Sequence, residues 1–283
     1  MSEYKDHYPV LLEETIKLLN PEKGKIFIDC TFGFGGHSRE ILKKGAKVIG
    51  IEWDSQVAEK AERIEGLILE NDNYANIDKV ALKHNLKNID GILIDLGLSS
   101  WDLENSCRGF SFKEENQGLD MRYSLNGKEK ASDILNDYTK EELEEIFKNY
   151  GELRSARKFA QQIYESRKIK RIETVKDLKD SLSDCTKKCL AMIFQALRIE
   201  ANRELENLKI VMPKAFQLLG RNGRLAIISF HSLEDRIVKN YFRDLKQEGL
   251  AEILTKKPLV ASREELEKNK RSGSAKLRVI QKI

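Results

Sequence analysis

The first 100 residues alternate between short apolar runs and stretches in which apolar positions follow a helical spacing. Residues 91–96 are apolar at nearly every position, which is typical of a strand buried on both faces of a parallel sheet. Strands that alternate with helices predict right-handed crossovers and a doubly wound α/β sheet. The expected strands are 26–30, 46–52, 67–69 and 91–96, and the expected helices are 9–19, 36–44, 55–63 and 75–85.

From about residue 113 to 200 the pattern changes to helical periodicity, with no convincing strand. Strand character returns at 224–230, and a helix is expected to start near Ser232. The chain is expected to end with two edge strands, 250–254 and 276–281. The expected helices of the central region are 141–149, 153–167, 175–183 and 191–206.

This pattern predicts two parts. Residues 1–112 and 201–283 are expected to form one α/β domain, and residues 113–200 an all-helical insertion. The insertion leaves the sheet at the end of strand 91–96, which is the edge where ligands of such sheets bind. We therefore expect the insertion to form the far wall of a substrate cleft.

A glycine-rich turn follows the first strand, and it predicts a cofactor site. A ligand can lie against Gly33, Gly35 and Gly36, because no Cβ intrudes there. The next strand ends in Glu52, whose carboxylate can accept hydrogen bonds from two ribose hydroxyls. Asp95 ends the strand 91–96 at the same edge. Together these residues predict a nucleoside-type cofactor at the carboxyl edge of a parallel sheet.

The spacing of the glycines favours one cofactor. The dinucleotide fingerprint G-x-G-x-x-G is not satisfied, because Ser38 occupies its last position. A phosphate-binding P-loop is absent, since no G-K-[ST] follows the glycines. S-adenosylmethionine suits this turn: it has no phosphate, and it carries an amino-acid end and a ribose diol.

Composition and charge narrow the class of protein. The chain has 40% hydrophobic and 34% charged residues, as soluble globular proteins do, and no apolar run approaches the roughly 20 residues of a membrane span. The N-terminus lacks the features of a signal peptide, so a cytoplasmic protein is expected. The four cysteines and four histidines show no zinc spacing; we expect unpaired thiols and no metal.

The net charge of +4 is distributed unevenly. Residues 154–171 contain seven Lys or Arg against Glu165 alone, and residues 255–283 contain nine against three Glu, whereas residues 133–145 are acidic. Such runs can be solvated helix faces, but two of them in a mildly basic protein favour a polyanionic partner.

Seven motifs occur in an order that makes the chain recognisable. They occupy residues 29–38, 95–100, 108–112, 119–122, 194–199, 229–236 and 274–278. From Tyr8 to the last residue the chain resembles the bacterial ribosomal small-subunit RNA methyltransferase H family, also called MraW. The resemblance implies a Rossmann-like methyltransferase sheet. It also implies methyl transfer from S-adenosylmethionine to N4 of a cytidine in 16S rRNA, in the decoding centre near the P site.

The resemblance also implies which residues bind the cofactor. They are Gly35, Gly36 and His37 at the turn, Glu52 at the ribose, Tyr74 near the adenine, Asp95, and Asp102. Three of them differ from the usual family residue. Glu52 stands where Asp is common, Asp102 where Gln is often found, and Tyr74 where Phe is usual.

The reaction requires alignment of the amine with the methyl group, exclusion of water, and acceptors for the amine hydrogens. We expect Asp95 to orient the amine with Ser99 or Ser100, supported by Asp120. Asp95 could instead cap the helix that follows it. His231 looks catalytic beside Ser232, but Ser232 and Asp235 also fit a helix capping box. A Ser-His-acid hydrolase is not expected, because the chain has no nucleophile elbow of the G-x-S-x-G type.

Other motif residues have two interpretations each. Phe110 and Phe112 either stack on a base or anchor the core. Arg108 and Arg122 either contact phosphates or pair with acids such as Asp120 and Glu114. Arg198 either faces the cleft or pairs with Glu200 or Glu204.

The sequence therefore predicts a 16S rRNA cytosine-N4 methyltransferase that meets its substrate in the small ribosomal subunit, without a membrane partner. A base must be unstacked before its amine can be reached, and the basic stretches fit recognition by shape and phosphate contact. An amino-methyltransferase acting on DNA or another RNA is the alternative within enzymes. A nucleotide-sensing RNA-binding protein without turnover is the alternative outside them. Monomer and dimer both remain open.

Overall fold

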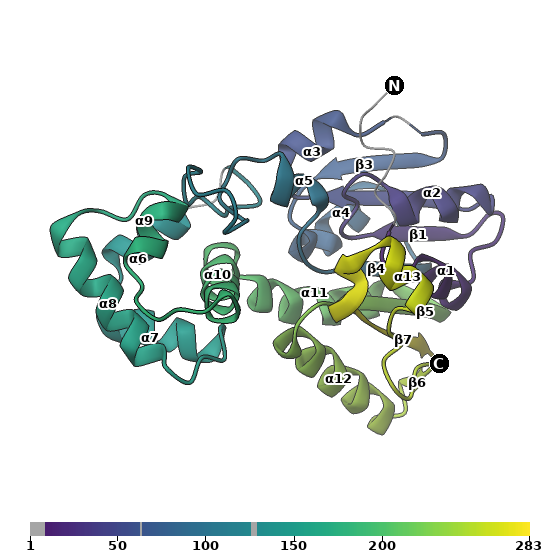
Figure 1. The fold of residues 1–283 in the computed structure, drawn as a ribbon. Helices are drawn as coiled ribbons and strands as arrows, with labels where there is room; N and C mark the ends of the chain where they lie inside the picture. Colours follow the sequence, from purple (N-terminus) through teal and green to yellow (C-terminus); the bar gives the residue numbers. More distant parts are fainter. Residues whose placement is uncertain (1–8, 63, 126–128) are drawn as a thin grey trace. The chain divides into compact units, whose positions relative to one another are not determined.

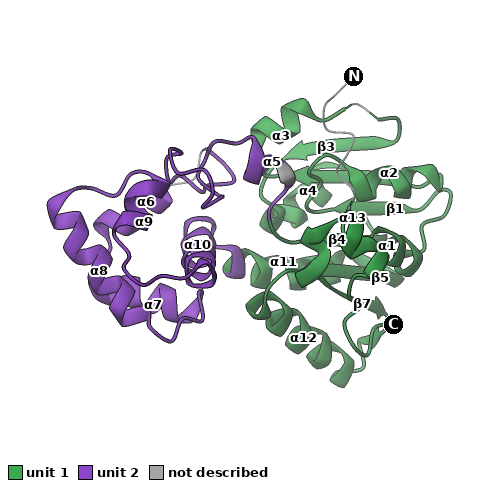
Figure 2. Ribbon diagram, in the orientation of Figure 1, with its two compact units in different colours: residues 1–97, 206–283 green, residues 98–205 purple. Residues whose placement is uncertain are grey.

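The computed structural model describes residues 9–62, 64–125 and 129–283. Figure 2 shows that the chain divides into two compact units. Unit 1 comprises residues 1–97 and 206–283, and unit 2 comprises residues 98–205. Within the described part of the chain, no helix is long and apolar enough to cross a membrane.

Unit 1 is built on a seven-stranded sheet in the order β3-β2-β1-β4-β5-β7-β6 (Figure 1). The first five of these strands are parallel, and β7 is antiparallel to both of its neighbours. The strands are β1 Ile26–Asp29, β2 Lys47–Glu52, β3 Leu67–Asn71, β4 Ile89–Asp95, β5 Leu219–Ser229, β6 Ala251–Ile253 and β7 Lys276–Lys282. The predicted doubly wound, Rossmann-like α/β sheet is confirmed.

Successive strand residues alternate between two cores, as the pleat of a sheet requires. Ile28, Ile92 and Ile227 pack with apolar side chains of α4, α11 and α12. Phe27 and Leu93, on the opposite face, pack with α1 and α2. Unit 1 is therefore a sheet covered by helices on both faces. Its helical elements are α1 Leu12–Leu19, α2 Gly36–Lys43, α3 Ser55–Lys60, η1 Tyr74–Asn76, α4 Ile77–Lys83, α11 Glu204–Leu218 (whose first two residues belong to unit 2), α12 Ser232–Gln247, α13 Arg263–Lys268 and η2 Lys270–Ser274.

Unit 2 has its own core, formed by helix faces that include Phe147, Ile163 and Leu197. Its described residues contain helices and one isolated bridge, Gly118 with Thr174, but no longer strand. The helices are α5 Ser100–Glu104, α6 Ala131–Asp137, α7 Lys140–Asn149, α8 Ala156–Ile169, α9 Val175–Asp180 and α10 Lys187–Asn202.

Three sequence predictions of the fold are wrong. The helix expected at 9–19 begins only at Leu12, because Leu11 has a left-handed backbone (φ 52°). Segment 276–281 was expected at an edge of the sheet, but β7 pairs with β5 on one side and with β6 on the other. The helix expected at 191–206 is two helices, because Arg203 has a left-handed backbone (φ 50°) that ends α10 before α11 begins. Helix periodicity does not reveal such a break, since the apolar spacing continues through it.

Candidate functional site

The glycine turn lies between β1 and α2, and the ring of Phe32 packs against it. Gly35 has φ +76°, a conformation that side-chain-bearing residues rarely adopt. A Cβ on Gly35 would lie 2.6 Å from the Phe32 ring, and a Cβ on Gly50 would lie equally close to the same ring. The buried ring therefore fills a slot between the turn and β2. Sequence reasoning did not single out Phe32 or Gly50, although a glycine inside a strand often marks such a close approach.

Glu52 ties the end of β2 to this turn. One carboxylate oxygen accepts a hydrogen bond from the Gly33 N–H (2.7 Å) and the other from the Asp54 N–H (2.8 Å). A carboxylate only accepts hydrogen bonds and has two acceptor positions on each oxygen, so Glu52 is of a type that suits hydroxyl donors as well as N–H groups. Tyr74 is buried, and its ring meets the Trp53 ring edge-on at 6.5 Å. Trp53 is a second aromatic at this strand end, which sequence reasoning missed.

Three acids gather at the carboxyl ends of β1, β4 and β5. Asp29 accepts hydrogen bonds from the Ser38 hydroxyl (2.7 Å) and the Thr31 N–H (3.3 Å), yet burial raises its pKa to about 6. Burial, together with the carboxylates of Asp29 and Glu234, raises the pKa of Asp95 well above its usual value. Within the described residues, no Lys or Arg forms a recorded ion pair with Asp29 or Asp95.

Asp95 carries a polar atom that still needs a partner. Its Oδ1 is buried and has no hydrogen-bond partner among the described residues. Its Oδ2 lies 3.7 Å from His37 Nδ1. A buried acceptor that makes no hydrogen bond lowers the stability of the folded protein. The acid cluster and its open acceptor therefore fit a ligand that brings positive charge and hydrogen-bond donors.

His37 occupies the first turn of α2 and is buried. Its Nε2 lies 3.0 Å from the Val10 carbonyl oxygen. Because a carbonyl only accepts hydrogen bonds, this ring nitrogen carries the hydrogen. The other nitrogen, Nδ1, is thereby directed toward Asp95.

The cap of α12 differs from the prediction. The N-cap residue is His231, and Glu234 completes the capping box by accepting the His231 N–H (3.3 Å) and the Phe230 N–H (2.8 Å). The predicted box of Ser232 and Asp235 is wrong by one residue. Asp235 instead accepts a hydrogen bond from Arg278 Nε (2.7 Å) on β7. The sequence fits both capping boxes, His231 with Glu234 and Ser232 with Asp235, because a histidine can also cap a helix through a ring nitrogen.

In unit 2, two predicted site residues form the cap of α5. Ser99 donates its N–H (2.8 Å) and its hydroxyl (2.7 Å) to Asp102, and the Asp102 N–H donates to the Ser99 hydroxyl (3.2 Å). Asp102 is buried. The two residues satisfy backbone groups of a helix start, as a capping box does. Their predicted roles with substrate and cofactor remain predictions.

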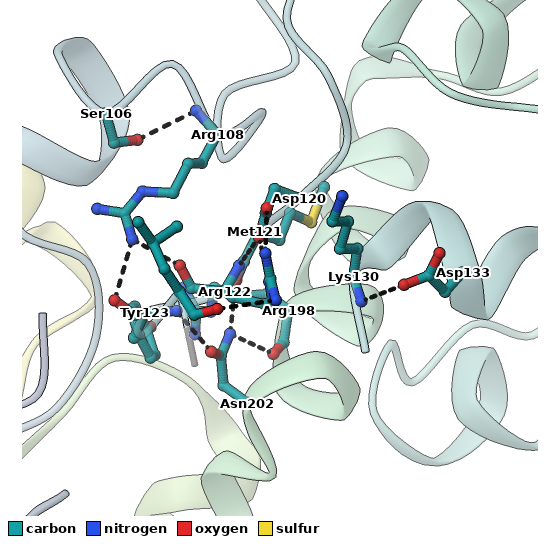
Figure 3. Close-up of polar contacts among 11 residues, drawn as sticks. Ser106, Arg108, Asp120, Met121, Arg122, Tyr123, Lys130, Asp133, Arg198 and Asn202 are labelled. Atoms are coloured by element: carbon teal, nitrogen blue, oxygen red, sulfur yellow. Dashed lines mark hydrogen bonds and ion pairs between the residues drawn. The ribbon is translucent and has the colours of Figure 1, made fainter. Parts of the chain in front are cut away.

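Asp120 pairs with Arg122 through two hydrogen bonds of 2.7 and 2.8 Å (Figure 3). Burial alone would raise the pKa of Asp120, but the hydrogen bonds from Arg122 hold it below its usual value. The nearby Arg108 side chain is buried and donates to the carbonyls of Arg122 and Tyr123 (2.7 and 3.0 Å). Arg108 therefore holds the backbone of residues 121–123 in place. Arg122 was expected either to contact phosphates or to pair with an acid, and the structure shows its ion pair with Asp120.

The remaining motif residues of unit 2 also have internal partners. Arg198 makes a two-fold ion pair with Glu204 (2.8 and 2.9 Å), as one of its two interpretations expected. Phe110 is buried and stacks on Tyr123 with ring centroids 5.7 Å apart. Phe112 packs edge-on against Phe194, in the core of unit 2. The core interpretation is confirmed for the buried Phe110, and the half-buried Phe112 packs against the same core.

The basic stretch 154–171 is largely compensated by nearby acids. Lys158, Lys168 and Lys170 pair with Asp184, Glu165 and Asp177. Arg171 pairs with Asp137 and Glu173. Arg167 donates to the Leu135 carbonyl (2.8 Å) and lies over the Tyr164 ring. Arg167 thus supports the fold of unit 2. The pairs of Lys158, Lys168 and Arg171 are exposed and contribute little stability, whereas Lys170 pairs with the largely covered Asp177.

Comparison with known proteins identifies the family. Residues 4–283 match the MraW methylase family. The chain is 41% identical to the ribosomal RNA small subunit methyltransferase H of Clostridium botulinum, over 98% of this chain and 99% of that one. It is 43% identical to the protein of that name from Persephonella marina, with the same coverage. It is 44% identical to the one from Nautilia profundicola, over 98% and 97%.

The match covers nearly the whole chain and includes the glycine turn, the strand-end acids and the helical unit. Identities above 40% over this length leave no room for a different family. The chain belongs to the MraW methylase family and is an S-adenosylmethionine-dependent methyltransferase.

Proposed function

We propose that this protein is a 16S rRNA (cytosine-N4)-methyltransferase that modifies one cytidine of the decoding centre, near the P site. The observation that carries the proposal is the full-length similarity to relatives named ribosomal RNA small subunit methyltransferase H. The open acceptor on Asp95 supports an amine as the group that is methylated, because an amine has hydrogens to donate. The substrate partner is 16S rRNA within the small ribosomal subunit.

The residues at the carboxyl edge of unit 1 fit the cofactor. Gly35, Gly36 and His37 would hold its amino-acid end, Glu52 its ribose hydroxyls, and Tyr74 would lie near its adenine. S-adenosylmethionine is cationic at its sulfonium and its ammonium. A cation beside Asp95 would favour the ionised carboxylate, which burial and the nearby Asp29 and Glu234 disfavour in the free protein. The unused Oδ1 of Asp95 would accept a hydrogen bond from the ammonium or from the substrate amine. Asp102 would contribute through the start of α5, where its carboxylate accepts the Ser99 N–H and hydroxyl.

The bound cofactor supplies a methyl group that its sulfonium has already activated. The protein must then hold the amine in line, exclude water and accept the amine hydrogens as nitrogen becomes tetrahedral. Asp95 is our candidate for that acceptor. Ser99 and Asp120 are candidates for orienting the base, Ser99 through its hydroxyl and Asp120 through the loop that Arg122 holds. No strong base is required, since the amine becomes acidic once it has been attacked.

The helical part, proposed as residues 113–200, would recognise the RNA around the target. RNA is bound largely through shape and phosphate contacts. Exposed cations that pair only with exposed acids can exchange those partners for phosphates at small cost. This applies to Lys168 and Arg171. Lys170 is itself exposed, but its partner Asp177 is only 15% exposed.

The experiment is transfer of tritium from labelled S-adenosylmethionine to purified small ribosomal subunits that lack the modification, with free 16S rRNA in parallel. Nuclease digestion then locates the label. Label in N4-methylcytidine at a single decoding-centre position is the expected result. Label at another atom or position would refute the proposed specificity. Cofactor binding without any transfer to either substrate would favour another nucleic acid or a protein without turnover.

A further inference from the structure

The segment Pro9–Leu11, here called the strap, precedes α1 and contacts two distant parts of unit 1. Val10 and Leu11 are buried although they lie outside any helix or strand. No cofactor or substrate role was predicted for these residues. Their contacts are with the glycine turn on one side and with α13 on the other.

Pro9 is packed against the first residue of α2. A Cβ on Gly36 would lie 2.3 Å from Pro9 Cγ, which is closer than real carbon atoms approach. The backbone of Gly36 itself does not have a positive φ, so its conformation would allow alanine. Gly36 therefore has to be glycine because of the strap. A Cβ at this position would be directed at Pro9. The need for glycine therefore follows from a contact within the protein, without any ligand.

Val10 contacts the side chain of His37, the residue that follows Gly36 in the turn. Its carbonyl oxygen lies 3.0 Å from His37 Nε2, which fixes the tautomer of the ring and its orientation. The other ring nitrogen then lies 3.7 Å from Asp95 Oδ2. The strap thus contacts two of the three residues expected to hold the amino-acid end of the cofactor, and through His37 it reaches the acid at the end of β4.

Leu11 anchors the strap from the other side. Its buried N–H donates to Glu265 Oε1 on α13 at 2.8 Å, across 254 residues of sequence. Its backbone is left-handed (φ 52°), which is uncommon for leucine and is maintained only where surrounding contacts demand it. Glu265 is itself buried. The C-terminal helix thereby holds the N-terminal segment against the cofactor turn.

We propose that the strap, anchored by Glu265, is a positioning element of the cofactor site, which fixes the start of α2 and the ring of His37 for S-adenosylmethionine. The proposal rests on the cofactor part of the proposed function and not on its RNA substrate. Pro9 and Glu265 act through Gly36 and His37. They are positioning residues, with no predicted contact to the reacting atoms.

The first test is Glu265→Ala in the full-length protein, with Glu264→Ala as its control. Glu264 is an exposed neighbour in the same turn of α13, and no hydrogen bond from it to the strap is recorded. We measure the affinity for S-adenosylhomocysteine by calorimetry, without RNA. Because a buried N–H loses its acceptor, we expect Glu265→Ala to raise the Kd about tenfold, equivalent to about 1.4 kcal/mol. The control should be unchanged.

Hydrogen exchange provides the second readout. Amides of residues 35–37 should exchange faster in Glu265→Ala than in Glu264→Ala, because the turn loses its support. A purely structural role predicts a different result: a lower Tm for Glu265→Ala, with cofactor affinity and exchange at the turn unchanged well below that Tm. That result would overturn the proposal.

A pair of variants keeps the test independent of Glu265. Gly36→Ala forces a clash with Pro9 and should weaken binding of S-adenosylhomocysteine. Pro9→Ala removes the clashing Cγ, so the double variant should recover part of the lost affinity. Strictly additive effects would contradict the proposal. These assays contain no RNA, so a wrong assignment of the methylated base would leave their outcome unaffected.

Discussion

In unit 1, the buried Asp29 and the half-buried Asp95, whose Oδ1 is buried, lie at strand ends without an ion pair to Lys or Arg among the described residues. In unit 2, Asp120 and Glu204 each accept two hydrogen bonds from one arginine. Both arrangements carry acids out of water, but only the second compensates them within the protein. Uncompensated acids are found where a ligand supplies the missing charge, whereas compensated ones support the fold.

This comparison changes how the motifs are interpreted. Several charged residues that mark the family lie in unit 2 and are engaged with each other, as Figure 3 shows for Arg108, Asp120 and Arg122. At the strand ends of unit 1, Asp29 accepts the Ser38 hydroxyl and Glu52 accepts backbone N–H groups, whereas Asp95 Oδ1 has no partner among the described residues. We expect substitutions of Arg108, Arg122 and Arg198 to act on stability, and substitution of Asp95 to act on chemistry.

The largest effect is expected for Asp95→Asn. Loss of the carboxylate should lower the rate of methyl transfer by about 10²–10⁴-fold at saturating cofactor, the range of a positioned proton acceptor. Asp90→Asn is the matched control on the same strand, because its side chain accepts the Ile26 N–H and Asn retains an acceptor. The measurement is the single-turnover rate of methyl transfer, compared between Asp95→Asn and Asp90→Asn. Equal rates would remove Asp95 from the chemistry.

Arg198→Ala tests the compensated acids of unit 2. It leaves Glu204 buried without its arginine, which should lower the free energy of unfolding by about 3–5 kcal/mol. Adding Glu204→Gln removes the stranded charge and should restore much of that loss. Urea unfolding followed by circular dichroism measures both. If the double variant is no more stable than Arg198→Ala, the ion pair is not what holds this region.

The pH dependence of stability sharpens the contrast further. The pKa of Asp29 is about 6 in the folded protein, above its unfolded value of 3.8. The folded state therefore binds the proton more tightly, and stability should fall as pH rises from about 4 to 6 and stay lower above that. Asp29→Asn should remove this fall and gain up to about 3 kcal/mol at pH 8, at 1.36 kcal/mol for each pKa unit. Unchanged pH dependence in the variant would show that Asp29 is not its source.

The smallest effect is expected for the exposed pairs of unit 2. Replacing Lys168, Lys170 and Arg171 with Gln should weaken RNA binding and reduce the slope of log Kd against log salt by about 0.7–0.9 for each lost phosphate contact. Arg167 is left in place because it supports the Leu135 carbonyl. Replacing the exposed Lys43, Lys44 and Lys47 of unit 1 with Gln removes the same number of charges and is the control for net charge. Loss of cofactor affinity in the triple variant would instead mean that this segment supports the fold.

Much of the fold was predictable because its signals are local. The alternation of apolar runs with helical periodicity depends on neighbours within a few residues, and it predicted β1, β2, β4 and α2 to within a residue or two. The glycine turn and the acid at the end of β2 followed from the same short stretch. The hydrogen bond between Gly33 and Glu52 now shows that these two features form one structure.

Errors arose where the outcome depended on distant partners. The register of the α12 cap was misjudged because Asp235 is engaged by Arg278, 43 residues further along the chain. Segment 276–282 is an inner strand because β6 adds beyond it, which no property of the segment itself indicates. The ring of Phe32 explains Gly50, but only the folded chain brings the two together.

The sequence by itself determined the sheet, the glycine turn, the family and the list of candidate residues, since each depends on local periodicity or on an ordered set of motifs. Only the tertiary structure decided which charged groups compensate each other and which remain open for a ligand. It also decided that Pro9–Leu11 joins α13 to the cofactor turn. The physical reason is the same in both cases: the energy of a buried charge or N–H depends on the partners that folding brings beside it, and those partners are far away in the sequence.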